Sequence, residues 1–245
     1  MTGQMTFDDL VEKPRPKKLR VLVACEESQE VCKAFRANGH EAYSCDIQEC
    51  SGGHPEWHIQ GDVLPLLNGD CTFTTRGGQT VRIDGKWDLI IAHPPCTYLT
   101  VTGNAWFDVT RYGDAAKNRY KNRYKAIVFF MYFALANCDR ICIENPVGIM
   151  GTAWHSSNQV IQPWQFGHPT VKKTCLWLKG LPPLTPTDIV EVDKSDVYAY
   201  VAKNGRIKHD SRNRSRFHGE DRSKHRSRTF PGIGKAMADQ WGGVV

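Results

Sequence analysis

Five short apolar runs, each ending at or beside an acid, a histidine or a proline, constrain the fold of this chain most strongly. They cover residues 19–25, 41–47, 57–63, 88–93 and 140–146. Their length and their β-branched content are typical of buried strands. Helical spacing of apolar residues follows the first run as far as Gly39 and returns over 115–137. Strands that alternate with helices predict an α/β protein with a doubly wound, mostly parallel sheet.

Polar side chains gather where these predicted strands end. Open α/β sheets bind their ligands beyond the carboxyl ends of the strands. In this chain those ends carry Cys25-Glu26, Asp46, Asp62, Pro95-Cys96 and Glu144-Asn145. The sequence therefore predicts one functional site at this edge of the sheet.

Positive charge is concentrated near the C-terminus. Residues 203–228 hold ten Lys/Arg against three Asp/Glu, a local +7, so the net charge of +6 leaves the rest of the chain near −1. Such a segment is typical of a protein that contacts a phosphate backbone, although it is also compatible with a solvated loop. We expect a flexible arm over 1–17, a catalytic domain over 18–182 plus 229–245, and a short basic segment over 183–228 for target recognition or DNA contact.

The nine cysteines indicate a reducing compartment, which we expect to be the cytoplasm. Their number is odd and their spacing is irregular, unlike a disulfide framework. A zinc site made by Cys45, Cys50, His54 and His58 is the less favoured alternative, because the two cysteines are farther apart than in the usual zinc motifs. The longest apolar run, 126–136, is shorter than the roughly 20 residues that cross a bilayer.

The turn after the first strand argues against a dinucleotide cofactor. It reads ACEES and lacks the glycines that cradle a pyrophosphate. Asp46 follows about twenty residues later, at the place of a ribose-binding acid. Asp62 is suited to an adenine amino group. An adenosine cofactor without phosphates fits these acids, although each acid alone is also typical of a helix cap.

The motif HPPC, residues 93–96, combines a rigid turn with a thiol. Two prolines fix φ and remove backbone donors, so they carry Cys96 away from the sheet in a fixed direction. A thiolate held in this way is suited to nucleophilic attack, whereas a small core cysteine is the simpler alternative. The motif ENP, residues 144–146, places Glu144 at the end of another apolar strand, where a buried acid is costly unless it has a partner or a task.

PPC and ENP, in this order and strand context, resemble motifs of the DNA (cytosine-5) methyltransferase family. PPC resembles the nucleophile motif of that family, and ENP resembles its Glu-Asn-Val motif. The segment FPGIGKAMADQWG, residues 230–242, is similar to its C-terminal motif, which forms a helix. The resemblance covers most of residues 19–180 and 228–242. It implies a sheet of the S-adenosylmethionine-dependent methyltransferase type and a minimal, divergent member of the kind expected in bacteriophage genomes.

The chain also departs from this family. Its first turn replaces the usual Phe-x-Gly-x-Gly, and only about 45 residues are available where the family carries a large recognition region. The family's Gln-x-Arg-x-Arg stretch is not intact, and residues 165–178 occupy its region.

The resemblance implies a role for each of several residues. Cys96 adds to C6 of cytosine, Glu144 assists at N3, and Asn145 completes the catalytic set. S-adenosylmethionine is the methyl donor. The residues expected at the cofactor are Cys25, Glu26, Ser28, Asp46, Asp62 and Pro94, and those expected to contact double-stranded DNA are Lys172, Lys173, Arg212, Arg214, Arg226 and Arg228.

Two other functions remain open from the sequence. The same thiol addition on RNA or on a free pyrimidine nucleotide would suit the short recognition segment. A catalytically silent nucleic-acid-binding protein on the same fold is the second alternative, and the presence of both Cys96 and Glu144 argues against it. The sequence assigns no role to His93.

Overall fold

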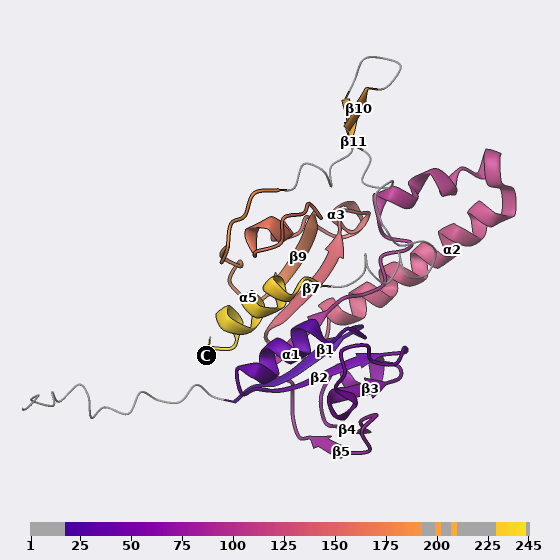
Figure 1. Cartoon of the computed structure of the whole chain (residues 1–245). Helices are drawn as coiled ribbons and strands as arrows, with labels where there is room; N and C mark the ends of the chain where they lie inside the picture. Colours follow the sequence, from indigo (N-terminus) through magenta and orange to yellow (C-terminus); the bar gives the residue numbers. More distant parts are fainter. Residues whose placement is uncertain (1–17, 193–198, 202–206, 210–228, 244–245) are drawn as a thin grey trace, which may run out of the picture.

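A seven-stranded, mostly parallel sheet forms the centre of the α/β fold (Figure 1). The structure is a computed structural model that describes residues 18–192, 199–201, 207–209 and 229–243. The strands lie in the order β3 (His58–Gln60), β2 (Glu41–Asp46), β1 (Arg20–Ala24), β6 (Leu89–Ala92), β7 (Ile141–Pro146), β9 (Thr174–Lys179) and β8 (Gln159–Ile161). The first five are parallel, and β9 runs antiparallel to both of its neighbours. The predicted α/β class and mostly parallel sheet are confirmed.

The strand order reverses between β1 and β6. The chain builds β1, β2 and β3 outward in one direction, returns to pair β6 with β1, and then adds β7 on the other side. Such a reversal leaves a crevice outside the carboxyl ends of the two central strands, which is where ligands of open sheets bind. The segments that follow β1 and β6 therefore flank the expected binding position.

Alternate residues of the central strands pack against helices on both faces. On one face Val21 and Val23 pack in a cluster with residues of α1 (Glu30–Ala37) and α5 (Pro231–Trp241). On the other face Leu22 and Ala24 belong to a cluster with the second half of α2 (Val109–Ala134). Side chains of successive strand residues point to opposite faces, so these strands are apolar throughout. The predicted C-terminal helix is α5, which lies within residues 230–242 and beside α1 (Figure 1).

The remaining elements are short. The 3-10 helices are η2 (Pro55–Trp57), η3 (Leu64–Leu66), η4 (Val101–Phe107) and η5 (Pro163–Gln165). The other elements are the short helix α3 (Met150–Ala153) and the strands β4 (Cys71–Thr74), β5 (Thr80–Ile83), β10 (Ala199–Val201) and β11 (Ile207–His209). The pair β10–β11 is antiparallel and lies in the basic segment. The predicted arm over 1–17 lies outside the described residues.

The sequence of residues 78–88, GQTVRIDGKWD, predicts a small hairpin with Asp84-Gly85 as its turn, and the structure shows that this turn is wrong. The hairpin pairs β4 with β5, and its turn is formed by residues 75–79. Gly78 supplies the positive φ of 85° there, and Thr75 Oγ1 accepts the backbone N–H of Gln79. Gly85 instead closes the base of the hairpin, where its N–H donates to the Asp70 carboxylate at 2.7 Å.

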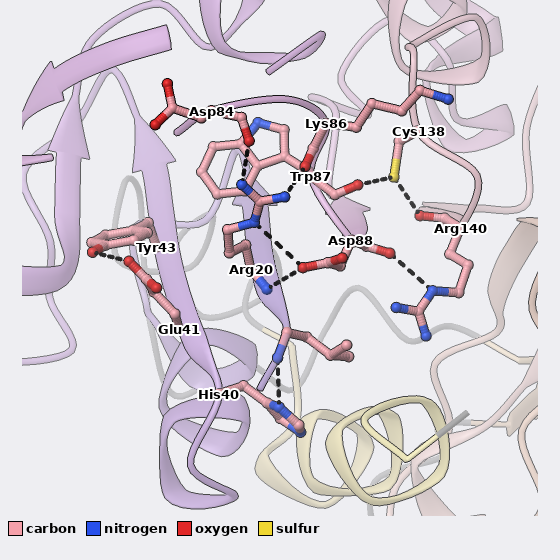
Figure 2. Close-up of polar contacts among 11 residues, drawn as sticks. Arg20, His40, Glu41, Tyr43, Asp84, Lys86, Trp87, Asp88, Cys138 and Arg140 are labelled. Carbon is pink, nitrogen blue, oxygen red and sulfur yellow. Dashed lines mark hydrogen bonds and ion pairs between the residues drawn. The ribbon is translucent and has the colours of Figure 1, made fainter. Parts of the chain in front are cut away.

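Asp88 ties the central strands together at their amino ends (Figure 2). Its carboxylate accepts the backbone N–H of Arg20 at 2.8 Å and lies 3.5 Å from Arg20 Nε. Its carbonyl accepts Arg140 Nε at 2.9 Å. The Arg20 guanidinium also donates to the carbonyls of Asp84 and Lys86. These bonds join the starts of β1, β6 and β7 at the edge opposite to the expected ligand position.

We expect Asp88→Ala to lower the free energy of unfolding by about 1–3 kcal/mol, because the Arg20 N–H then loses its acceptor. Urea unfolding measures the change. The matched control is Asp84→Ala, whose exposed side chain pairs with Arg82 and whose loss is expected to cost at most about 1 kcal/mol. Equal losses in the two variants would contradict the role given to Asp88.

Candidate active site

The carboxyl edge of the sheet brings together the two motifs that the sequence singled out. Pro94, Pro95 and Cys96 follow β6, and Glu144 and Asn145 end the neighbouring strand β7. Because β6 and β7 are parallel partners, the two segments leave the sheet at the same edge. The side chain of Asn145 donates to the carbonyl of Pro94 at 2.7 Å, which links the two motifs directly.

The loops beyond these motifs are also paired. The backbone N–H of Val101 donates to the Val147 carbonyl at 3.2 Å, and that of Ile149 donates to the Leu99 carbonyl at 2.8 Å. Between them, Gly148 approaches Leu99 so closely that a Cβ at Gly148 would lie 2.1 Å from its carbonyl oxygen. Only glycine permits this approach. The pairing holds the Cys96 segment against the segment that follows Glu144.

The backbone of Cys96 is held in a tight turn. Its carbonyl accepts the N–H groups of Leu99 and Thr100, both at 2.9 Å. Pro94 is buried, Pro95 is exposed, and the exposure of Cys96 lies between these extremes. The turn therefore presents a partly accessible cysteine from a backbone with little freedom.

Glu144 forms a buried cluster with His93 and Thr229. Its Oε2 lies 3.1 Å from His93 Nδ1 and accepts the Thr229 hydroxyl at 3.3 Å. Thr229 Oγ1 lies 3.4 Å from His93 Nδ1. The sequence missed both partners of Glu144, because no motif marks Thr229 and because a histidine before two prolines has no assigned role. The first residue of the HPPC motif thus meets the first residue of the ENP motif.

Opposite charges stabilise each other within this cluster. Burial raises the pKa of Glu144, but the hydrogen bond and charge of His93, with smaller effects of Lys172 and Thr229, bring the pKa below its ordinary value. Burial lowers the pKa of His93, but Glu144 and then Glu26 bring it above its ordinary value. The pair is therefore an imidazolium next to a carboxylate over a wider pH range than either group alone would allow.

Two polar atoms of the site are buried without a hydrogen-bond partner among the residues that the structure describes. They are His93 Nε2 and Asn145 Oδ1. Buried polar atoms almost always have partners, so unsatisfied ones are unusual. Both belong to the side chains that surround the PPC and ENP segments, and both are suited to bind a polar ligand.

Glu26 caps the first helix. Its two carboxyl oxygens accept the backbone N–H groups of Val31 at 2.6 Å and Cys32 at 3.2 Å. Glu26 and Ser28 are only 3% and 4% exposed. The N-terminus of α1 is the position at which dinucleotide-binding folds hold a phosphate. In this chain the protein's own carboxyl group takes the two N–H donors there.

Cys25, Asp46 and Asp62 lie near one another at the ends of β1, β2 and β3. Cys25 has a φ of 58°, which turns the chain sharply at the end of β1. Burial and then the charge of Asp46 raise the pKa of Cys25 well above its usual range, so Cys25 remains a thiol. Burial likewise raises the pKa of Asp46, whose Oδ1 accepts the N–H of Gln48. Asp62 is exposed and accepts the N–H of Leu64. The roles predicted for these residues at a cofactor stay predictions.

The residues predicted to contact DNA are only partly described. Lys172 is half-buried, its ammonium lies 5.6 Å from the centre of the Phe230 ring, and its charge acts on both His93 and Glu144. Lys173 is exposed. Arg212, Arg214, Arg226 and Arg228 lie outside the described residues. Lys172 therefore belongs to the surroundings of the Glu144 cluster.

Two arginines that the sequence analysis did not select hold the loop after Cys96. Arg119 Nη2 donates to the Thr97 carbonyl at 3.1 Å, and Arg123 Nε donates to the Tyr98 carbonyl at 2.8 Å. Both come from α2, one turn apart. The repeated sequence NRYKNRYK over 118–125 is the signal that could have drawn attention to them.

Neither a metal site nor a membrane span is found in the described part of the chain. No group of three or more His, Cys, Asp or Glu side chains is arranged to hold a metal ion there. His58 is instead bonded to Ser44 and to the Gln48 carbonyl, and His54 stacks on Trp57. None of the described helices is both long and apolar enough to cross a membrane.

The buried carboxyl group of Glu26 predicts a pH dependence of stability. Burial raises its pKa from 4.5 to about 7, so the folded chain binds this proton more tightly than the unfolded chain does. Stability therefore falls as the pH rises from about 4.5 to 7, by about 3 kcal/mol for this group. Urea unfolding across this range tests the slope. We expect Glu26→Gln to remove it and Glu30→Gln, on the same helix, to keep it; a flat or rising profile in the unmodified protein would contradict the prediction.

Comparisons with known proteins assign the chain to no family. A scan against family models found none that matches the chain, and a search of curated proteins found no match either. A function is therefore inferred from the geometry of the residues themselves.

Proposed function

We propose that this protein methylates C5 of cytosine in DNA with S-adenosylmethionine as the donor, through covalent addition of Cys96 to C6 of the base. The observation that carries the proposal is the direct link between the PPC and ENP segments, in which Asn145 binds the Pro94 carbonyl at 2.7 Å. This link holds a partly accessible thiol and a buried carboxylate at one edge of the sheet. A pyrimidine that reaches the edge would meet both groups.

The sheet supports a fold of the S-adenosylmethionine-dependent methyltransferase type. Its first five strands have the order β3-β2-β1-β6-β7, which corresponds to 3-2-1-4-5 of a doubly wound sheet, and antiparallel β9 follows them. The segments beyond β1 and β6 flank the reversal point. The acids beyond β1, β2 and β3 would then lie on the cofactor side, and Cys96 and Glu144 on the substrate side.

The carboxylate acceptors near the reversal point fit an adenosine cofactor that carries no phosphate. Asp46, at the end of β2, has carboxylate oxygens suited to ribose hydroxyls, and Asp62 is suited to the adenine amino group. The N-terminus of α1 is already capped by Glu26, so a pyrophosphate there would meet a carboxyl group. When bound, S-adenosylmethionine supplies the electrophilic methyl group.

Cys96 makes C5 reactive. C5 of cytosine is a weak nucleophile, and addition of the Cys96 thiolate at C6 pushes an electron pair toward N3, so that C5 gains enamine character. After C5 has been methylated, loss of its proton restores the C5–C6 double bond and expels the thiolate. Such covalent catalysis divides one difficult step into easier ones. A target base in duplex DNA must first leave the helix, which costs roughly a few kcal/mol.

Glu144 and His93 would deliver a proton to N3 and take it back. The electron pair that moves toward N3 during addition requires a proton there, and Glu144 is the group suited to hold it. His93 lies 3.1 Å from the same carboxylate and carries a proton on its imidazolium form. A proton passed from His93 through Glu144 would neutralise N3 as the thiolate adds, and it would return when the thiolate leaves.

DNA containing 5-fluorocytosine tests the covalent step, because fluorine at C5 cannot leave as a proton does. With S-adenosylmethionine we expect a denaturant-stable protein–DNA adduct, detected as a shifted band in a denaturing gel. Cys96→Ala should abolish this adduct. The matched control is Cys71→Ala, which alters a cysteine of β4 that is also partly buried but lies outside both motifs, and which should leave the adduct intact.

The choice of DNA makes the test independent of the recognition sequence, which is unknown. A library that presents 5-fluorocytosine in every short sequence context contains the site, whatever its sequence is. Sequencing of genomic DNA for 5-methylcytosine after expression gives an independent readout. Absence of both adduct and genomic methylation would reject cytosine-5 methylation of DNA, whereas an adduct that persists in Cys96→Ala would reject Cys96 as the nucleophile.

His93→Asn tests the proposed proton path. We expect its rate of methyl transfer to fall by about a hundredfold to ten-thousandfold, the range typical of general acid–base groups. The unmodified protein should lose activity as the pH rises through the raised pKa of His93, because the imidazolium is the proton donor. His93→Asn should lack this alkaline limb, and His155→Asn, at an exposed histidine, should keep it. Retention of the limb in His93→Asn would contradict the path.

The two alternatives predict different results in the same assays. An enzyme acting on RNA or on a free pyrimidine nucleotide would give the Cys96 adduct with that substrate and none with DNA. A silent nucleic-acid-binding protein would bind DNA without any adduct. The buried pair of Glu144 and His93 argues against the silent protein, because a buried ion pair is costly to keep without a task.

A further inference from the structure

Helix α2 changes character along its length. Residues 117–125 read KNRYKNRYK, with five Lys/Arg and no acid, whereas residues 126–134 read AIVFFMYFA. Phe130 and Phe133 of the second half are fully buried in the core beneath the sheet. The first half, which we call the basic half of α2 (Lys117–Lys125), has no comparable apolar face.

The basic half extends beyond the carboxyl edge of the sheet. The helix runs without interruption from the kink at Gly113 to Ala134, a length of about 31 Å at 1.5 Å per residue. Strand β7, which follows it, has six residues and spans only about 20 Å. Because the chain passes from the end of α2 to the start of β7 within a few residues, the excess length lies at the other end of β7. Figure 1 shows α2 projecting past the strands.

Because the repeat NRYK is four residues long, each of its residue types lies on its own face of the basic half. Residues four positions apart lie one above the other on a helix. Arg119 and Arg123 face the loop that follows Cys96 and bind the carbonyls of Thr97 and Tyr98. Tyr124 is 70% exposed, and Tyr120 is 50% exposed while its ring also packs edge-on against Phe107, with 4.9 Å between the ring centroids. The lysines of the basic half, Lys117, Lys121 and Lys125, are exposed as well, and Lys117 pairs with Asp114 at 3.0 Å.

Exposed tyrosines alternate with exposed lysines along the basic half of α2. Aromatic rings that alternate with cations are the combination by which proteins bind unpaired nucleic-acid strands, since the rings stack on bases and the cations meet phosphates. A duplex conceals the faces of its bases and offers these rings nothing to stack on. The surface also begins next to Thr97 and Tyr98, directly after the thiol proposed to attack the base.

We propose that the basic half of α2 binds single-stranded DNA, with bases next to the target cytosine stacked on Tyr120 and Tyr124 and their phosphates at Lys117, Lys121 and Lys125. The inference rests on the proposed function for the identity of the target base and narrows its substrate to unpaired DNA. Arg119 and Arg123 fasten the surface to the Cys96 loop, so that a strand lying on the helix is aligned with the thiol.

Tyr124→Ala is the most direct test, because Tyr124 is the more exposed of the two rings. Fluorescence anisotropy with a labelled, cytosine-containing single strand measures affinity without cofactor or chemistry. We expect binding to weaken about fivefold to a hundredfold, the range for loss of one base–aromatic stack. Tyr132→Ala is the matched control: it lies on the same helix and is 51% exposed, but it belongs to the second half, and its affinity should equal that of the unmodified protein.

The lysines are tested by the salt dependence of binding. Lys121→Gln should reduce the slope of log affinity against log salt concentration by about 0.7, the value for one phosphate of a single strand. Lys235→Gln, at an exposed lysine of α5, should leave the slope unchanged. Thermal unfolding of each variant checks that the fold is retained, since only exposed side chains are changed.

Several results would overturn the inference. They are unchanged affinity in Tyr124→Ala, an equal loss in Tyr132→Ala, or tighter binding of duplex DNA or of RNA of the same sequence. The readouts separate this inference from the proposed function. If the protein binds single strands through Tyr124 but forms no 5-fluorocytosine adduct, the proposed methylation is rejected and the proposed single-strand binding surface is retained. If Tyr124→Ala forms the adduct equally well, the binding surface is rejected and the methylation is retained.

Discussion

The hydrogen bond from the Asn145 side chain to the Pro94 carbonyl is the contact on which the candidate site depends. Both residues lie at strand ends, and the strands β6 and β7 are themselves aligned by parallel pairing. A backbone without N–H groups at Pro94 and Pro95 can be held only through its carbonyls and its packing, so an amide side chain from the next strand is a suitable anchor. The pairing of the loops at Gly148 extends the same connection outward.

The electrostatics of the site follow from this connection. Once the two segments are joined, His93 and Glu144 meet in a region from which water is largely excluded. Each of the two charges is stabilised there by the opposite charge of its partner. Thr229, which precedes α5, adds a hydroxyl to the same carboxylate. The helix after Thr229 packs on α1, and α1 is capped by Glu26, whose charge also acts on His93. A chain of contacts therefore runs from the turn after β1 to the Glu144 cluster.

The sequence predicted the strands, their parallel arrangement and the edge at which PPC and ENP lie, because these depend on local apolar patterns and on general rules for α/β sheets. It did not predict the partners of Glu144, because His93 and Thr229 are 136 positions apart and nothing local to either residue indicates that they meet. It predicted a hairpin over 78–88 that turns at Asp84-Gly85, a good turn signal, whereas the observed hairpin turns at Gly78 and Gly85 closes its base at Asp70. The role of Glu26 was missed for a similar reason: a carboxylate can face a ligand or a helix end, and only the path of the turn decides between them.

The capping of α1 by Glu26 also explains how the turn between β1 and α1 is stabilised without glycines. Glycine-rich turns bring the backbone close to a pyrophosphate and leave the helix N–H groups for it. Here Cys25 and Gln29 both adopt a left-handed φ without being glycine, which costs conformational energy. The two bonds that Glu26 accepts from Val31 and Cys32 offset part of that cost. Because the carboxyl group of Glu26 already occupies the helix N–H groups, a phosphate would lack its usual donors there. This arrangement, together with Asp46 beyond β2, agrees better with the proposed nucleoside cofactor than with a dinucleotide.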